Sequence, residues 1–224
     1  CEPLALSFTT MNRTQPQPRL YDFVVGPDAN DDGKTIASAI QAAPTDGSRF
    51  LVFIKNGVYN ERISVGSAKS NLCLVGQSRD GVIVNGAAYS GDANGSTTSN
   101  CQTVEILANN FYAENITIRN SAGMNAGQAV ALKDYGDRNV YFNVKLLGYQ
   151  DTHLTGNGRQ YYEQCQINGT VDFIFGGGDV FFDRCLLYLE DRANNVVVAP
   201  STKADSQWGY VFSHCTIDGA AINN

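Results

Sequence analysis

Two aspartates, Asp151 and Asp172, stand where the sequence would otherwise read as apolar strand. Asp151 follows Gln150 in the segment GYQDT, and Asp172 lies between Val171 and Phe173 in the segment GTVDFIFG. Each acid therefore interrupts a run with the pattern of a buried strand. Burial of an uncompensated carboxylate is costly, so such a group caps a turn, closes a salt bridge, or has a shifted pKa and takes part in catalysis.

The spacing of these polar residues favours a shared site over two unrelated turn caps. Asp172 follows Asp151 by 21 positions, and Gln150 follows Gln128, in the segment GQAVAL, by 22 positions. Nearly equal offsets indicate a repeating coil, in which residues one repeat apart stack on one face. We therefore expect the members of each pair to lie side by side on adjacent coils.

The composition limits the classes of function. The chain has 224 residues, of which 43% are hydrophobic and 17% charged, which suits one large all-β domain. A net charge of −6 argues against nucleic acid and anionic membrane surfaces and fits a neutral or esterified substrate. The sequence has two His and no CxxC, HExxH or GxxxxGK[ST] motif, so we expect no metal site and no phosphate-binding loop. No apolar run approaches the roughly 18 residues of a membrane helix.

The N-terminal residues and the cysteines bear on location. Residues 1–20 contain Pro3, Pro16 and Pro18, and we expect them to form an irregular leader before one domain over residues 21–224. Six cysteines among many Asn, Gly and Thr residues fit a secreted, extracellular protein. Cys1 is either the lipid-modified N-terminus of a periplasmic or outer-surface lipoprotein, or a cloning boundary.

Hydrophobic periodicity predicts one short helix and many short strands. Ile36, Ala39, Ile40 and Ala43 recur at helical spacing, and Pro44 ends the run. Runs of apolar and aromatic residues separated by Gly and Asn predict strands at 21–25, 50–55, 72–75, 82–84, 104–107, 116–118, 129–132, 140–147, 161–167, 171–175, 180–189, 196–198 and 210–217.

One pattern recurs in the later strands. YYEQCQI, FFDRCLL and YVFSHCTI contain Cys165, Cys185 and Cys215 at one position, and FYAENIT and VYFNVKL place Asn115 and Val144 there. Steps of 20 to 30 residues without long helices are typical of a parallel β-helix. A β-sandwich is the competing interpretation, but it would require hairpin turns at closer, regular spacing. The short helix would then cap one end of the solenoid and cover its strand edges.

The same pattern bears on a disulfide. Cys165 and Cys185 are 20 positions apart in equivalent positions, so on adjacent coils their Cα atoms would lie about 5 Å apart, within reach of a disulfide bond. The alternative is a ladder of reduced cysteines that pack as small apolar residues.

Three motifs together resemble the pectin methylesterase family. GQAVAL, GYQDT and GTVDFIFG occur in this order and with these gaps, and KTIASAIQAAP followed by FLVFIKNGVYNERI resembles the opening helix and strand of that family. The resemblance extends from Tyr21 to Asn224. It implies a right-handed parallel β-helix that hydrolyses the methyl esters of homogalacturonan, the backbone of pectin, without a cofactor.

The resemblance also assigns roles residue by residue. Asp172 matches the nucleophile of the family, Asp151 the general acid and base, and Gln128 and Gln150 the amides that hold the oxyanion. These roles agree with the chemistry of the residues, because two neighbouring carboxyl groups repel and separate into an acid and a nucleophile.

Neighbouring residues are candidates for substrate contact. Phe175 and Tyr149 are either core aromatics or rings that line a sugar groove, and we expect Phe175 to line the groove and Val171 to form its wall. The family commonly has an aromatic residue shortly after the YQDT motif. This sequence has His153 and Leu154 there, so that sugar contact differs.

The sequence departs from the family again near Asn224. Family members have a Leu-Gly-Arg-Pro-Trp motif one coil beyond the segment that 210–218 resembles, and no arginine here matches it, including Arg159, Arg184 and Arg192. We therefore expect the domain to be incomplete at its C-terminal end and to need a complementary segment in cis or in trans. The remaining alternatives are a related esterase or thioesterase of other specificity and an inactive sugar-binding β-helix.

Overall fold

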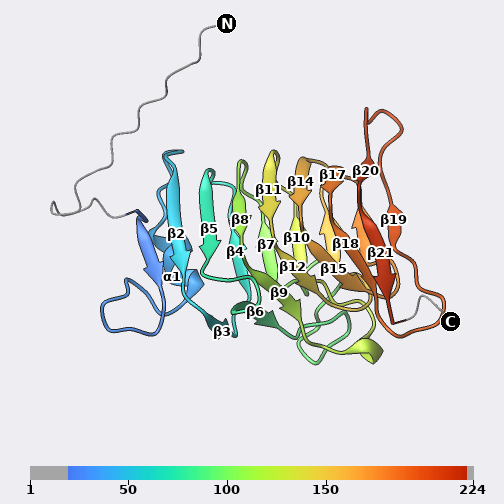
Figure 1. The fold of residues 1–224 in the computed structure, drawn as a ribbon, viewed down its shortest axis with the longest axis horizontal. Coiled ribbons are helices and arrows are strands. Elements are labelled where there is room, and N and C mark those ends of the chain that lie inside the picture. Colours follow the sequence, from blue (N-terminus) through green and yellow to red (C-terminus); the bar gives the residue numbers. More distant parts are fainter. Residues whose placement is uncertain (1–19, 221–224) are drawn as a thin grey trace, which may run out of the picture.

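Strands of successive coils pair in parallel throughout residues 20–220, the part of the chain that the computed structural model describes. The coils stack along the long axis of the molecule, from the N-terminal coil at the left of Figure 1 to the C-terminal coil at the right. Each complete coil contributes one strand to each of three sheets. The predicted right-handed parallel β-helix is therefore confirmed. The predicted leader lies almost wholly outside the described residues, as does Cys1.

The three sheets run the length of the stack. The first sheet comprises β1 (Phe23–Val25), β2 (Phe50–Ile54), β5 (Leu72–Gly76), β8 (Tyr112–Glu114), β11 (Asn139–Phe142), β14 (Arg159–Glu163), β17 (Asp179–Asp183) and β20 (Tyr210–Ser213). The second comprises β3 (Gly57–Tyr59), β6 (Val82–Gly86), β9 (Thr117–Asn120), β12 (Lys145–Leu147), β15 (Gln166–Gly169), β18 (Leu186–Leu189) and β21 (Thr216–Gly219). The third comprises β4 (Ile63–Val65), β7 (Val104–Ile106), β10 (Leu132–Asp134), β13 (His153–Thr155), β16 (Ile174–Gly176) and β19 (Val198–Pro200).

The one α-helix in the described residues, α1 (Ile36–Ala42), lies at the N-terminal end of the stack (Figure 1). The Thr35 hydroxyl caps the helix by accepting a hydrogen bond from the Ser38 amide. Ile36, Ala39 and Ile40 are buried, as the helical spacing predicted. A short 3-10 helix, η1 (Met124–Ala126), precedes β10. No helix among the described residues is long and apolar enough to cross a membrane.

The longest predicted strands are each two strands joined by a sharp corner. The predicted strand 140–147, for example, is β11 followed by β12, with Asn143 between them at φ 50°. Asn115, Gln164, Arg184 and His214 occupy the same corner with φ between 52° and 56°. The corner amides still bond to the next coil, as Gln164 N does to the Asp183 carbonyl at 3.0 Å. Asn tolerates this left-handed conformation better than most residues.

The cysteine pattern marks a buried column next to these corners. Val144 is followed in register by Cys165, Cys185 and Cys215. On the preceding coil this column contains Ile116 and not Asn115, the residue that the sequence pattern placed there, because Lys145 pairs with Thr117.

The predicted Cys165–Cys185 disulfide is wrong, because all five cysteines in the described residues are free thiols. Cys165 Sγ lies 3.4 Å from the Tyr141 carbonyl oxygen, and Cys185 Sγ lies 3.5 Å from that of Tyr162. Each thiol thus hydrogen-bonds to the backbone of the preceding coil. The alternative of a reduced cysteine ladder is the one that the structure shows.

Aromatic rings form a second buried column under the first sheet. Tyr141, Tyr162, Phe182 and Phe212 stack with ring centroids 4.5, 5.0 and 4.7 Å apart. The first three side chains are fully buried. Because large apolar rings contribute most of the area removed from water, this column supplies much of the stability of the C-terminal coils.

We expect Phe182→Ala to destabilise the protein by about 3–5 kcal/mol, because it leaves a cavity between stacked rings. Phe181, its neighbour in β17, is 40% exposed on the outer face, so Phe181→Ala should cost less than about 1 kcal/mol. Urea unfolding followed by circular dichroism measures both losses. Equal losses for the two variants would contradict the assignment of the buried column.

Candidate active site

Asp151 and Asp172 occupy equivalent positions of adjacent coils. Asp151 lies two residues before β13 and Asp172 two residues before β16, and these strands pair with His153 opposite Ile174. The Asp151 amide donates to the Val171 carbonyl at 3.0 Å, so the backbone ladder continues up to the two acids. The side-by-side arrangement expected from the offset of 21 is confirmed.

Both acids have left-handed backbone conformations, with φ of 64° at Asp151 and 51° at Asp172. This conformation costs roughly 1 kcal/mol or more at a residue with a side chain, and strain of this kind is often found at functional sites. The bend at Asp172 also explains why β16 begins only at Ile174, whereas the sequence predicted a strand from Val171.

The surroundings of Asp151 favour its neutral form. Its side chain is buried and its residue is 5% exposed. Burial raises the pKa of the Asp151 carboxyl to about 7, and the negative charge of neighbouring Asp172 contributes in the same direction. Asp172 is only half-buried. The two acids therefore differ in environment, which is the condition for a proton donor beside a nucleophilic carboxylate.

Gln128 and Gln150 are a pair of glutamines on adjacent coils, next to the two acids. They face each other as an isolated parallel bridge between adjacent coils, as the offset of 22 predicted. Leu132 and His153 are partners in the register of β10 and β13. Gln128 lies four residues before Leu132, whereas Gln150 lies three residues before His153, so the offset between the two glutamines is 22 and not 21. The extra residue lets the Ala131 and Leu132 amides both donate to the carbonyl of Thr152. The structure thus brings all four predicted catalytic residues to one edge of the third sheet.

Thr98 contacts this site and was not predicted. Its hydroxyl donates a hydrogen bond of 2.8 Å to Oε1 of Gln128, which is 30 positions away. Thr98 belongs to the 87–103 loop, which connects β6 to β7 and has no periodic pattern. No local signal in the sequence distinguishes it from the other Ser and Thr residues of this loop.

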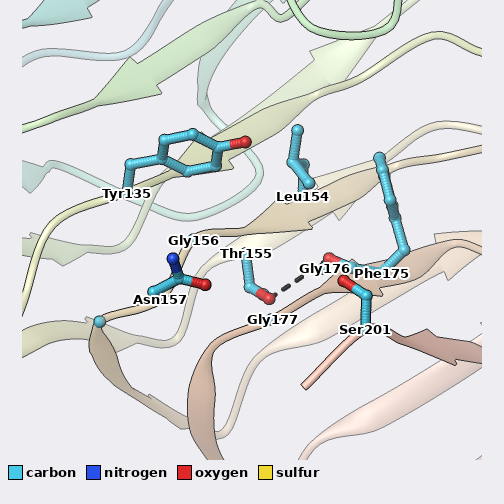
Figure 2. A pocket seen from close by; sticks show the side chains of 10 residues that line it. Tyr135, Leu154, Thr155, Gly156, Asn157, Phe175, Gly176, Gly177 and Ser201 are labelled. Atoms are coloured by element: carbon cyan, nitrogen blue, oxygen red, sulfur yellow. Dashed lines mark hydrogen bonds between the residues drawn. The ribbon is translucent and has the colours of Figure 1, made fainter. Parts of the chain in front are cut away.

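A groove of about 530 Å³ lies on the outer face of the third sheet, at the ends of β13 and β16 away from the acids. Tyr135 and Phe175 lie on its two sides, with Leu154 between them (Figure 2). Asn157 and Ser201 add polar groups to the lining. The prediction that Phe175 lines a groove agrees with this position.

Glycines allow the coils under this groove to approach closely. A side chain on Gly158 would meet the Gly136 carbonyl oxygen at 2.0 Å, and one on Gly176, at φ 116°, would meet the Thr155 carbonyl oxygen at 2.1 Å. The floor of the groove is therefore backbone, which leaves room above it for a ligand.

Other residues near the motifs have different positions. Tyr149 lines a separate groove together with Asn120 and Asn168, so it does not share the surface of Phe175. Val171 is half-buried, and its carbonyl serves the backbone ladder at Asp151.

His153 and Leu154, which replace the aromatic residue expected after YQDT, point in opposite directions. His153 is fully buried, its Nδ1 lies 3.2 Å from the Leu132 carbonyl oxygen, and its ring packs edge-on against Tyr162. Burial lowers the pKa of His153 to about 4, so the imidazole is neutral near pH 7. Leu154 packs outside the sheet with Cys101, Val130 and Phe175.

Two arginines that we did not assign to the site are occupied elsewhere. Arg159 pairs with Asp137 at 2.6 Å, and Arg184 pairs with Glu163 at 2.5 Å and Asp183 at 2.8 Å. Neither guanidinium is placed to orient Asp172.

Comparison with known proteins agrees with this architecture. Residues 22–224 match the family model described as Pectinesterase. "Pectinesterase 2" of Citrus sinensis is 37% identical over 204 residues, which span 89% of this chain and 39% of that protein. The chain thus spans about two-fifths of the length of that relative. It spans 70% of "Probable pectinesterase 56" of Arabidopsis thaliana, at 35% identity.

Solved structures show the same fold. Pectin methylesterase from carrot superimposes with a TM-score of 0.86 at 32% identity, covering 92% of this chain and 66% of that one. Pectin methylesterase PemA from Erwinia chrysanthemi gives 0.81 at 36% identity, covering 90% and 67%. With the paired acids and amides at the edge of the third sheet, these matches lead to one conclusion: the chain belongs to the pectinesterase family.

Proposed function

We propose that this chain carries the catalytic centre of an esterase that hydrolyses the methyl esters of homogalacturonan to pectate and methanol. One observation carries the proposal: Gln128 pairs with Gln150, and Asp151 lies beside Asp172, on adjacent coils at the same end of the third-sheet strands. The substrate class is supported by the family and by a related pectin methylesterase, 35% identical, whose structure is described as a complex with a hexasaccharide. Methanol release from methylated pectin distinguishes this activity from that of a related esterase or thioesterase and from mere sugar binding.

The first half of the reaction forms an acyl-enzyme. The Asp172 carboxylate attacks the ester carbonyl carbon, and the side-chain N–H groups of Gln128 and Gln150 stabilise the tetrahedral oxyanion. Neutral Asp151 gives its proton to the departing methoxy oxygen, so methanol leaves and Asp151 becomes a carboxylate. The intermediate is an anhydride between Asp172 and the galacturonate carboxyl group.

The second half regenerates the enzyme. The Asp151 carboxylate takes a proton from water, and the resulting hydroxide attacks the anhydride. Collapse of the tetrahedral intermediate releases the free galacturonate and the Asp172 carboxylate. Asp151 ends the cycle protonated, as its raised pKa favours. No cofactor takes part in either half.

The groove beside Phe175 is proposed to hold neighbouring sugar residues of the polymer. Aromatic rings commonly pack against the apolar faces of sugars, and Tyr135 and Phe175 offer two rings separated by Leu154 (Figure 2). Tyr149 and Val171 are proposed to contact the substrate near the acids. A polymer outside cells is the proposed substrate, so the proposed location of the protein is extracellular.

A complementary segment, in cis or in trans, is proposed to cover the last described coil. Ile217 lies in register with buried Leu187, and Phe212 lies in register with buried Phe182, yet Ile217 is 52% and Phe212 37% exposed. Core positions left exposed in this way normally pack against another element. Such a segment is also a candidate source of the arginine of the Leu-Gly-Arg-Pro-Trp motif, which no arginine of this sequence matches.

Substitution of the acids tests the mechanism. We expect Asp172→Asn to abolish methanol release and Asp151→Asn nearly to abolish it, while circular dichroism spectra stay unchanged. Asp80→Asn is the control, because the Asp80 side chain is 67% exposed in an ion pair with Lys145. An Asp172 or Asp151 variant that keeps more than a few per cent of the activity would remove that residue from the mechanism.

The pH dependence tests the role of Asp151 as acid. The free enzyme needs neutral Asp151, and the fraction of the neutral form falls as the pH rises through the raised pKa of about 7. We expect kcat/KM for methanol release to be highest below about pH 7 and to fall about tenfold per pH unit well above it. Unfolding midpoints over the same range serve as the control. A kcat/KM that stays flat from pH 6 to about pH 9 would contradict this assignment.

A further inference from the structure

A second groove follows the outer face of the second sheet, and none of the four catalytic residues lines it. Its volume is about 370 Å³, and it lies at the ends of β9, β12, β15 and β18, which are neighbours in the sheet (Figure 1). Arg119, Tyr149 and Glu190 are among its lining residues. We infer that this groove binds de-esterified galacturonan and that Arg119 pairs with a free carboxylate of the polymer. The inference takes the polymer from the proposed function and adds a second binding site for it.

The groove runs along the stack of coils. Arg119 of β9 is the register partner of Leu147 in β12, which also lines the groove. Asn168 belongs to β15, and Glu190 directly follows β18. Strands of one sheet are about 4.8 Å apart, so the steps from β9 to β18 cover about 14 Å. A site of this length suits an extended segment of a polymer better than a single small molecule.

This groove is separate from the groove beside Phe175. Among the residues that the structure describes, none lines both grooves. Tyr149, however, directly precedes Gln150 and Asp151 in the chain. A polymer bound in the second groove therefore lies next to the segment that carries two catalytic residues without occupying the reaction site.

Side-chain hydrogen bonds hold Arg119 in place. Its Nε donates to Oδ1 of Asn85 at 2.7 Å, and Nδ2 of Asn85 donates to Oδ1 of Asn60 at 2.9 Å. Because a guanidinium group can only donate, the oxygen of the Asn85 amide has to face it, and this leaves the amide nitrogen for Asn60. The bond to Asn85 uses Nε, so the terminal nitrogens of Arg119 are available for a ligand.

No ion pair neutralises the charge of Arg119. Arg138, Arg159 and Arg184 contact carboxylate oxygens at 2.8, 2.6 and 2.5 Å. Within residues 20–220, by contrast, no carboxylate lies at ion-pair distance from Arg119, whose side chain bonds to an amide instead. An arginine that is held in place without an ionic partner is well suited to bind an anion.

A second chain of hydrogen bonds holds Glu190. Nε2 of Gln166 donates to Oδ1 of Asn168 at 2.8 Å, and Nδ2 of Asn168 donates to Oε1 of Glu190 at 2.7 Å. A carboxylate has lone pairs for several donors, so Glu190 can also accept hydrogen bonds from hydroxyl groups. Arg119 and Glu190 thus provide a fixed donor and a fixed acceptor on different coils of the same groove.

The two chains of hydrogen bonds are not needed to keep the coils in register, because the backbone pairing of β9 with β12 and of β15 with β18 already does so. Fixing a long polar side chain costs up to about 2 kcal/mol of conformational entropy. Side chains that are fixed before a ligand arrives do not lose this entropy on binding, which raises the affinity. The arrangement therefore favours a binding function over a purely structural one.

The chemistry of the groove fits an acidic sugar. The terminal nitrogens of a guanidinium group match the two oxygens of a carboxylate. The ring of Tyr149 can pack against the apolar face of a sugar, and Glu190 can accept hydrogen bonds from its hydroxyl groups. A methyl-esterified residue has no carboxylate for Arg119, so the groove prefers the product of the proposed reaction over its substrate.

Binding is tested by ¹⁵N NMR with short, fully de-esterified galacturonate oligomers. These oligomers are also expected to enter the groove beside Phe175, so the readout has to be local. We expect the Nε–H signal of Arg119 and the amide signal of Gly148 to shift, and to shift much less with fully methylated oligomers, which the Asp172→Asn variant keeps intact. Signals that stay unchanged up to millimolar oligomer, or equal shifts with both oligomers, would overturn the inference.

Substitutions of Arg119 test the contact with the carboxylate. Arg119→Gln removes charged hydrogen bonds, so the affinity followed at Gly148 should fall about ten- to a hundredfold. Arg119→Lys keeps the charge and should lower the affinity less. The control is Arg184→Gln, which removes one positive charge from the outer face of the first sheet and should leave the affinity unchanged. An equal loss in the control, or no loss in Arg119→Gln, would contradict the assigned role of Arg119.

The result does not depend on methanol release. If the oligomers bind at Arg119 but the unsubstituted chain releases no methanol from methylated pectin, only the proposed function fails. If methanol is released while the signals of Arg119 and Gly148 stay unchanged, only the second binding site fails. Circular dichroism spectra of the variants, compared with that of the unsubstituted chain, show whether a lost affinity reflects a lost fold.

Discussion

The register of backbone hydrogen bonds between adjacent coils is the constraint on which the structure depends. The coils differ in length, with steps of 28, 21, 20 and 30 residues along the column from Ile116 to Cys215, yet strands in all three sheets remain in parallel register. Length differences are absorbed in the loops, and left-handed corner residues such as Asn143 and Gln164 return the chain to register. A side chain therefore meets the same column on every coil, and the aromatic and cysteine columns follow from this one rule.

The same register holds Asp151 and Asp172 side by side, although their carboxyl groups repel each other. Two carboxyl groups repel when they stack, and burial of Asp151 adds a desolvation cost that raises its pKa to about 7. The ladder bond from the Asp151 amide to the Val171 carbonyl keeps the coils from separating in response. Stability supplied by the core thus maintains an arrangement that two free carboxyl groups would avoid, and within it burial favours the neutral form of Asp151.

The outer face of the third sheet combines a groove with a backbone floor and the attached 87–103 loop. Backbone at Gly158 and Gly176 forms the floor of the groove. Leu154 faces the loop side, where it packs with Cys101, while Lys133 lies 4.9 Å from the ring centroid of Tyr135. The position that is usually aromatic after the YQDT motif therefore serves here to anchor the 87–103 loop. The Leu154 side chain thus packs with Cys101 of the loop and with Phe175 of the groove lining.

The sequence by itself determined the repeat, the short helix over Ile36–Ala42 and the pairing of Asp151 with Asp172, because residues one coil apart in a solenoid stack and their offsets are readable along the chain. It could not determine the corners within the predicted strands, because single left-handed residues leave the apolar pattern intact. It also favoured a Cys165–Cys185 disulfide, whereas both are free thiols that hydrogen-bond to backbone carbonyls. Only the tertiary structure brought Thr98 to Gln128, because a loop without periodicity is positioned by its packing against the sheet and not by its own sequence.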